Sequence, residues 1–187
     1  SRFRATIALQ LRRFTGVSNR QMVDQVSGVS VPCSTKGEKG YVSCGLVDWE
    51  VVRTCRAIID AAAKSPWNQI TTMLKFLGNL EGFFWSKVGK ERSQSFEVSN
   101  VGLVDGCLHG DGTVKLRRLV FSQSANAIGA PYVFSVASVK GGDLAIALTW
   151  QEGVLEVAKA SKIMEDLKNE LHLMAMELDL EDFNNVI

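Results

Sequence analysis

The stretch from Ser95 to Gly102 (SFEVSNVG) places polar side chains where an apolar strand gives way to turn-forming residues. Phe96 and Val98 alternate with polar neighbours, and this period of two predicts a half-buried strand. The asparagine and the final glycine favour a turn, so we expect the strand to end here. Such a strand end can aim the hydroxyl of Ser99 and the amide of Asn100 into a cleft. The alternative is that both side chains only satisfy backbone groups at the strand end.

Histidine is the commonest general base at neutral pH, and the chain has two histidines, His109 and His172. His172 lies beside the apolar stripe of the last predicted helix, which is typical of a partly exposed helical residue. His109 lies in a glycine-rich run, where Asp111 could orient it as a base. If this run were extended, Cys107, His109 and Asp111 would face one side. Three candidate ligands without a second pair at matching spacing favour a loop over a metal site, so we predict no bound metal.

Two further segments offer polar groups. Ser122, Gln123 and Ser124 follow an apolar run, and two polar strand ends in one sheet could line one channel; a solvated turn is the alternative. The run Lys140, Gly141 and Gly142 could bind a phosphate through its backbone N–H groups. A hairpin turn is the favoured interpretation, because the two glycines separate two alternating runs.

Hydrophobic periodicity predicts the elements that would position these groups. Alternation predicts strands at residues 2–12, 21–32, 41–46, 95–102, 114–122, 132–139 and 144–150. Apolar residues spaced by three and four predict helices after Asp48, from Pro66 to about residue 77, from residue 80 to about 89, and from about Val154 to Leu178. On the last helix, one apolar face should lie on the sheet, and it consists of Ala160, Met164, Leu167, Leu171, Met174 and Leu178.

The order of strands, helices, strands and helix predicts an α+β fold with a mixed, largely antiparallel sheet flanked by helices. The 187 residues fit one domain, and we expect residues 178–187 to form a frayed tail. The chain starts inside a predicted strand, which suggests the later part of a longer protein.

The bulk composition narrows the classes of partner and compartment. A net charge of +1 gives no reason to expect nucleic acid as a partner. Four cysteines without a C-x-x-C pair favour reduced thiols in a cytoplasmic protein. No apolar run approaches the roughly 18 residues that span a bilayer, and peripheral association with an internal membrane stays open.

Three segments in order carry a family resemblance: Ser95–Gly102, Val120–Ala125 (VFSQSA), and Ser135–Leu144 (SVASVKGGDL), which continues into ALTWQEG at residues 147–153. Each motif is short, and their order and spacing add most of the weight. Together they resemble the C-terminal half of the fungal and yeast alcohol O-acetyltransferases. These are CoA-dependent acyltransferases of the chloramphenicol-acetyltransferase fold. The chain lacks the D-F-G-W-G motif of the plant BAHD branch, which favours the fungal one.

The resemblance implies that residues 1–187 are the C-terminal lobe of a two-lobed enzyme with a channel between the lobes. In such enzymes the N-terminal lobe carries H-x-x-x-D, whose histidine is the general base. The matching place here, Trp150–Gly153, has no histidine, as expected of the second lobe. The resemblance further implies acetyl-CoA as co-substrate, an alcohol or hydroxylated secondary metabolite as acceptor, and a partner N-terminal lobe in the same protein or in a separate chain.

Carried over to this sequence, the resemblance places Ser99 and Asn100 beside the thioester, where a hydroxyl or amide assists the oxyanion. It places Ser122, Gln123 and Ser124 along the same channel, as cofactor-binding residues. Two alternatives stay open: a non-catalytic binding or assembly module of the same fold, and an enzyme that acylates amines.

Overall fold

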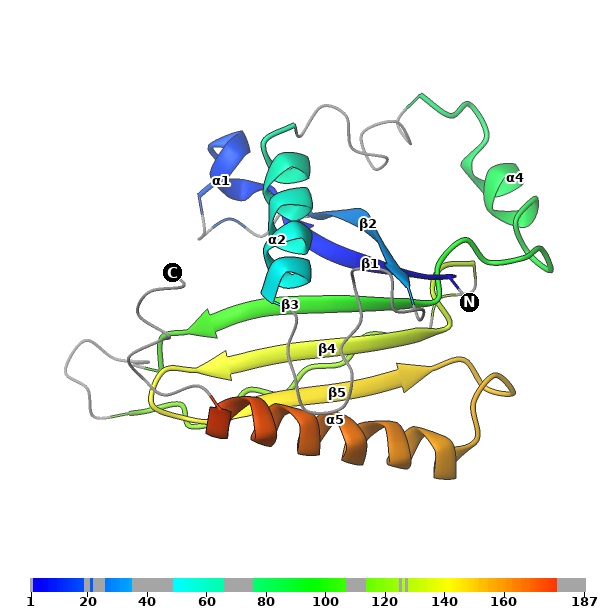
Figure 1. Cartoon of the computed structure of the whole chain (residues 1–187). Coiled ribbons are helices and arrows are strands. Elements are labelled where there is room, and N and C mark those ends of the chain that lie inside the picture. The colour runs from blue at the N-terminus through cyan, green and yellow to red at the C-terminus, as the bar shows by residue number, and fades with distance from the viewer. Residues whose placement is uncertain are drawn as a thin grey trace.

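The computed structural model describes residues 2–18, 21, 26–34, 49–65, 76–106, 114–124, 126 and 128–177. Within this part, one mixed sheet has the strand order β2-β1-β3-β4-β5 (Figure 1). Its strands are β1 (Arg2–Gln10), β2 (Val26–Ser34), β3 (Phe96–Val104), β4 (Tyr132–Val139) and β5 (Leu144–Trp150). The helices are α1 (Arg12–Thr15), α2 (Trp49–Ala63), α4 (Leu80–Trp85) and α5 (Val157–Glu177). The prediction of an α+β fold with a mixed sheet flanked by helices is confirmed.

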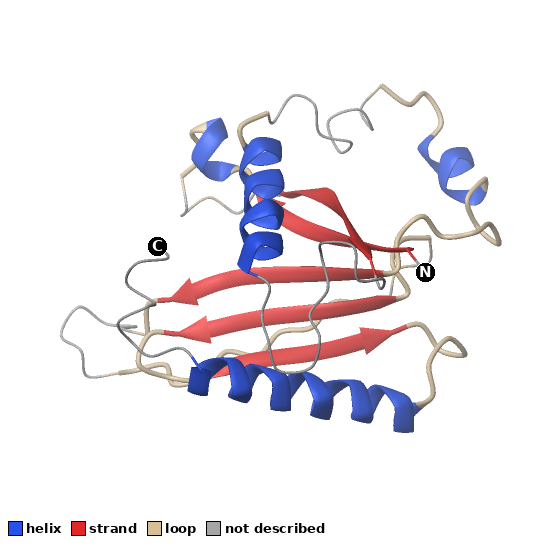
Figure 2. Ribbon diagram, viewed as in Figure 1, coloured by secondary structure: helices blue, strands red, loops and turns tan. Residues whose placement is uncertain are grey.

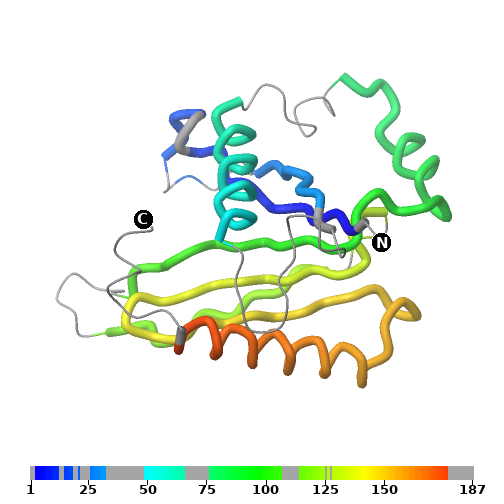
Figure 3. The backbone as a smooth tube through the Cα atoms, in the orientation of Figure 1, coloured from blue at the N-terminus to red at the C-terminus, as the bar shows by residue number. Residues whose placement is uncertain are grey.

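Antiparallel pairs form the two edges of the sheet, and parallel pairings form its centre. β1 and β2 pair in register from Arg2 opposite Ser34 to Gln10 opposite Val26. β4 and β5 form the predicted hairpin at the other edge. β3 lies between β1 and β4 and runs parallel to both. Parallel neighbours need long crossovers, and here α2 and α4 lie in the connection before β3. Figure 3 shows the chain passing from the blue N-terminal strands to the orange β5 at the opposite edge.

The two faces of the sheet are covered by different kinds of structure. α2 packs against β1 and β2, and α2 and α5 lie in front of the sheet in Figure 2. We call this side the helix face; Ala5, Leu9 and Val31 are buried on it. Residues 114–124 pass behind the sheet (Figure 1), and we call that side the loop face. There β4 buries Val133, Ser135, Ala137 and Val139, each at most 3% exposed.

The two long helices follow their predicted patterns. On α5, Ala160 is buried, and Met164, Leu167, Leu171 and Met174 are half-buried, which confirms this part of the predicted stripe; Leu178 lies outside the described residues. The helix begins at Val157, three residues later than predicted, after a turn in which the Val154 N–H donates to the Gln151 carbonyl. Within the described part of the chain, no helix combines the length and apolarity needed to cross a membrane.

The prediction of a strand at residues 114–122 is wrong. Lys115 forms only an isolated bridge, and residues 116–124 have no regular pairing, while β3 pairs directly with β4. Leu119 and Phe121 are half-buried, whereas Val120 and Ser122 are exposed. The alternation that suggested a strand therefore comes from a segment that lies on a face of the sheet, with one side inward. The predicted strand at 41–46 lies outside the described residues, as do residues 66–75 of the second predicted helix.

Candidate functional site

Ser99 lies near the middle of β3, on the loop face. Its backbone is in register with Ser135 of β4, and the residue is largely buried at 9% exposure. Residues in register on neighbouring strands point to the same side of a sheet, so Ser99 and Ser135 share this face. The Ser135 hydroxyl is buried and has no hydrogen-bond partner among the described residues. The hydroxyls of Thr6 and Thr149, on the same face, are also buried without such a partner.

Asn100 begins a β-bulge, and the strand does not end where we predicted. The β3–β4 register shifts between Asn100 and Leu103, and β3 continues to Val104. The Gly102 N–H donates to Asn100 Oδ1 at 2.8 Å, and Gly102 has a φ of 80°, a conformation that suits glycine. The Ser138 hydroxyl donates to the Gly102 carbonyl at 3.2 Å. The asparagine and glycine that suggested a terminal turn instead form a bulge within the strand.

Ser99 and Asn100 point to opposite faces of the sheet, as successive residues of a strand do. Asn100 is exposed on the helix face, where its carboxamide oxygen is engaged by the bulge. Its carboxamide nitrogen has no hydrogen bond to a described residue and is available as a donor. Because β3 is an inner strand, a molecule lying on one face of it contacts only one of the two side chains. The structure therefore separates the two residues that the sequence placed at one site.

Ser122, Gln123 and Ser124 are exposed, in the segment that crosses the loop face. The Asn126 carboxamide nitrogen donates to Glu97 Oε2 at 3.1 Å. Asn126, two residues after Ser124, is thus hydrogen-bonded to Glu97, two residues before Ser99. The structure brings this segment to the side of the sheet that holds Ser99, and not to the side of Asn100.

Arg92 joins the start of β3 to two distant parts of the chain. Its Nη1 donates to the carbonyls of Asn126 at 2.9 Å and Gly129 at 2.8 Å, and its Nη2 donates to Gln151 Oε1. Gln151 belongs to the Trp150–Gly153 segment, where a histidine is absent. In this structure the segment provides a hydrogen-bond acceptor for Arg92. Sequence reasoning missed Arg92, because its partners lie 34 to 59 positions away and no local pattern marks it.

Neither histidine belongs to a site that the structure describes. His172 is an exposed residue of α5, as expected. Cys107, His109 and Asp111 lie outside the described residues, so the loop and metal interpretations of that run stay untested. In the described part of the chain, no three His, Cys, Asp or Glu side chains are grouped closely enough to hold a metal ion.

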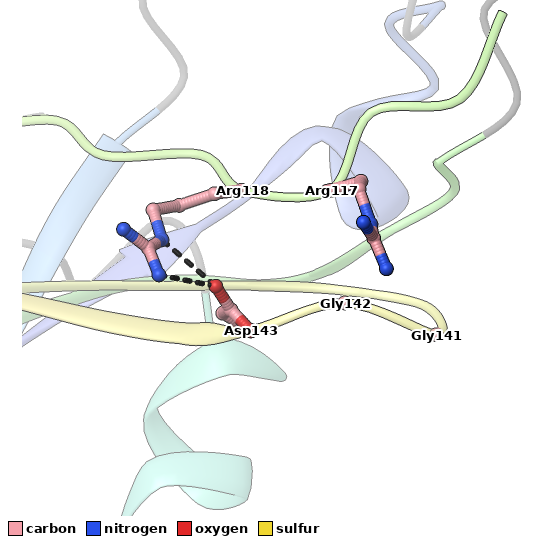
Figure 4. Close-up of a pocket in the computed structure, with 5 residues that line it drawn as sticks. All are labelled: Arg117, Arg118, Gly141, Gly142 and Asp143. Atoms are coloured by element: carbon pink, nitrogen blue, oxygen red, sulfur yellow. Dashed lines mark hydrogen bonds and ion pairs between the residues drawn. The ribbon is translucent and has the colours of Figure 1, made fainter.

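A hollow of about 520 Å³ lies between residues 117–118 and the turn of the β4–β5 hairpin (Figure 4). Arg118 and Asp143 close one side of it: Nε and Nη2 of Arg118 lie 2.8 and 2.6 Å from Asp143 Oδ2. The Asp143 N–H donates to the Arg117 carbonyl at 3.0 Å. A Cβ at Gly142 would lie 2.2 Å from that carbonyl oxygen, so only glycine permits this close approach.

Comparison with known proteins identifies the family. Residues 49–171 match the family model for alcohol acetyltransferases. The chain is 29% identical over 103 residues to "Probable alcohol acetyltransferase FCK4" of Fusarium pseudograminearum (strain CS3096), which covers 55% of this chain and 21% of the relative. It is 35% identical over 83 residues to "Probable alcohol acetyltransferase crmB" of Aspergillus fumigatus, which covers 44% of this chain and 18% of the relative.

These alignments span about a fifth of each relative's length. No solved structure matches the chain at a significant level. The family match includes β3, with Ser99 and Asn100, and continues through the β4–β5 hairpin into α5. The chain belongs to the alcohol acetyltransferase family.

Proposed function

We propose that this chain is the C-terminal lobe of a two-lobed enzyme that transfers the acetyl group of acetyl-CoA to a hydroxyl of an alcohol or hydroxylated secondary metabolite. The observation that carries the proposal is the family match over residues 49–171 in a chain without H-x-x-x-D. Thr113 and Met176 stand four residues after the two histidines, where that pattern needs aspartate. The general base would therefore come from an N-terminal lobe, in the same protein or in a separate chain.

The proposed reaction is a direct transfer. The histidine of the other lobe removes the proton of the acceptor hydroxyl, and the oxygen attacks the thioester carbonyl of acetyl-CoA. The tetrahedral intermediate carries an oxyanion that needs a hydrogen-bond donor. Its collapse breaks the carbon–sulfur bond, and the histidine returns the proton to the CoA sulfur. No covalent bond to this chain is required.

Two donors, one on each face of β3, support the assignment of an oxyanion site to this strand. The Asn100 carboxamide nitrogen is exposed and free of described partners on the helix face. Ser99 is mostly buried on the loop face, in register with Ser135, whose buried hydroxyl has no partner among the described residues. Ser122, Gln123 and Ser124 are exposed along the loop face and would contact the cofactor only if the channel follows the Ser99 side.

The first test measures acetyl transfer from acetyl-CoA to a panel of alcohols by purified residues 1–187. We expect no turnover above the enzyme-free rate from this chain alone, and turnover when a lobe with H-x-x-x-D is joined to it or added. Turnover by residues 1–187 without any partner would refute the need for a second lobe.

The second test separates the two donors in the active, two-lobed protein. Asn100→Asp keeps an oxygen to accept the Gly102 N–H and removes the NH₂ donor, whereas Ser99→Ala removes only a hydroxyl. Loss of an oxyanion donor lowers kcat by about 100- to 1,000-fold. If neither variant lowers kcat, both residues have only the structural role of hydrogen bonding within β3. Amines assayed beside alcohols distinguish N-acylation, and acetyl-CoA binding without turnover would indicate a binding module.

A further inference from the structure

The main chain of residues 116–118, which we call the strap, lies over the β4–β5 turn, and its Arg117 and Arg118 line the hollow. The Leu116 N–H donates to the Gly106 carbonyl at 2.7 Å, and the Asp143 N–H donates to the Arg117 carbonyl at 3.0 Å. These bonds hold residues 116 and 117 against the end of the sheet. The Arg118–Asp143 ion pair adds a third tie and neutralises the carboxylate that lines the hollow.

Arg117 is a cation over the turn that no described residue pairs. Its side chain is exposed and has no hydrogen bond or ion pair to a described residue. Figure 4 shows its guanidinium extending from the strap toward Gly141 and Gly142. Lys115, two residues before Arg117, and Lys140, which directly precedes Gly141, are also exposed. Among the described residues near the turn, these two lysines, Arg117 and Arg118 carry four positive charges, against the two carboxylates of Asp105 and Asp143.

The turn offers a backbone donor next to this guanidinium. The N–H groups of Lys140, Gly142 and Asp143 donate to the carbonyls of Val104, Val139 and Arg117. No described residue accepts the N–H of Gly141. Gly141 has a φ of 71°, and a Cβ built on it would meet nothing within 4 Å, so the space beside its Cα is open. An anion can therefore approach the main chain closely there.

We propose that Arg117 and the Gly141 N–H form a binding site for a phosphate group. The planar guanidinium donates two parallel hydrogen bonds to a tetrahedral anion, which is stronger than a contact between point charges. A free backbone N–H in a glycine turn adds a third donor, as in other anion-binding backbone concavities. The excess positive charge favours a multiply charged anion. The site rests on this geometry alone and needs no acetyl transfer.

The test follows the amide signals of ¹⁵N-labelled residues 1–187 by NMR during titration with inorganic phosphate at low salt. We expect saturable shifts of the Gly141 and Gly142 amides. Arg117→Gln should weaken binding about tenfold or more, because it removes a charge-assisted pair. Arg117→Lys keeps the positive charge but not the two parallel N–H donors, so its phosphate affinity should lie between those of the wild type and Arg117→Gln. Arg53→Gln, the same change on the exposed side of α2, should change the affinity less than twofold.

A second arm identifies the source of the phosphate. Binding of CoA about tenfold tighter than dephospho-CoA, with the difference lost in Arg117→Gln, assigns the site to the 3′-phosphate of CoA. If CoA and dephospho-CoA bind equally and inorganic phosphate still shifts the Gly141 amide, the site binds free phosphate. Either of these two results supports the proposed site. Unshifted Gly141 and Gly142 amides, or equal phosphate affinity of the wild type and Arg117→Gln with both folded, would overturn it. Because binding is read without turnover, either result is independent of the acetyl-transfer assays.

Discussion

Replacement of Gly142 by alanine should loosen the strap over the β4–β5 turn. The added Cβ would lie 2.2 Å from the Arg117 carbonyl oxygen, whereas ordinary contact begins near 3.4 Å. The obstacle is backbone, not the end of a flexible side chain, so residues 117 and 142 must separate by about 1.2 Å. That displacement breaks the 3.0 Å hydrogen bond from the Asp143 N–H to the same carbonyl.

The size of the effect follows from these two losses. Overpacking at a close contact costs about 1–3 kcal/mol, and a lost hydrogen bond about 0.5–1.5 kcal/mol. Partial relaxation of the exposed hairpin turn reduces the sum, so we expect the free energy of unfolding to fall by about 2–3 kcal/mol. With a urea m-value of about 2 kcal/mol/M, the midpoint should fall by about 1–1.5 M.

The assay is urea unfolding followed by tryptophan fluorescence, and Trp150 at the end of β5 reports on this sheet. Gly78→Ala is the matched control, because a Cβ there meets nothing within 4 Å and Gly78 does not have a positive φ. The same change in chain entropy should leave Gly78→Ala neutral or slightly stabilised. If Gly142→Ala and Gly78→Ala unfold at the same urea concentration, the contact between residue 142 and the Arg117 carbonyl does not limit the side chain at residue 142.

Three further substitutions test other parts of the site. Arg92→Met should lower the free energy of unfolding by about 2–4 kcal/mol in urea titrations, because it leaves three acceptors without their donor. Arg92→Lys should recover only part of this loss. If Arg92→Met is as stable as the wild type, Arg92 does not stabilise the contact between the start of β3 and the two distant segments that accept its hydrogen bonds. Ser135→Ala should be neutral or raise the free energy of unfolding by up to about 1 kcal/mol, because its buried hydroxyl has no described partner; a clear loss of stability in the same titration would reveal an unseen hydrogen bond. In the two-lobed enzyme, Asn100→Asp should lower kcat by about 100-fold or more if the acetyl group lies on the helix face, and Ser99→Ala should do so if it lies on the loop face; steady-state kinetics of both variants distinguish the faces.

The elements that follow from short-range patterns were predictable. The α5 stripe and the β4–β5 hairpin appear at their predicted places because spacing of three and four, or a glycine pair between alternating runs, decides them within a few residues. The same kind of signal misled at residues 114–122, because alternation reports only that one side of a segment is buried. A strand within a sheet and a segment lying on a sheet produce the same alternation.

The candidate site was predicted as a set of residue types, and its geometry was not. Gly102 of β3 has a positive φ and its N–H donates to Asn100 Oδ1, as in a turn, yet pairing with β4 resumes after them. Sequence cannot distinguish a strand's last turn from a bulge, since the difference lies in the neighbouring strand. The Arg92 hydrogen bonds were equally invisible, because each joins residues at least 34 positions apart.

The sequence alone determined the α+β class, the helical and hairpin elements near the C-terminus, and the family, because these depend on residue types at fixed, short spacings. Only the tertiary structure decided that Ser99 and Asn100 lie on opposite faces, that residues 114–124 cross the loop face, and that Arg117 extends over the Gly141–Gly142 turn. Each of these depends on strand order and register. Those are set by contacts between segments far apart in the chain, where no local pattern of side chains records the partner.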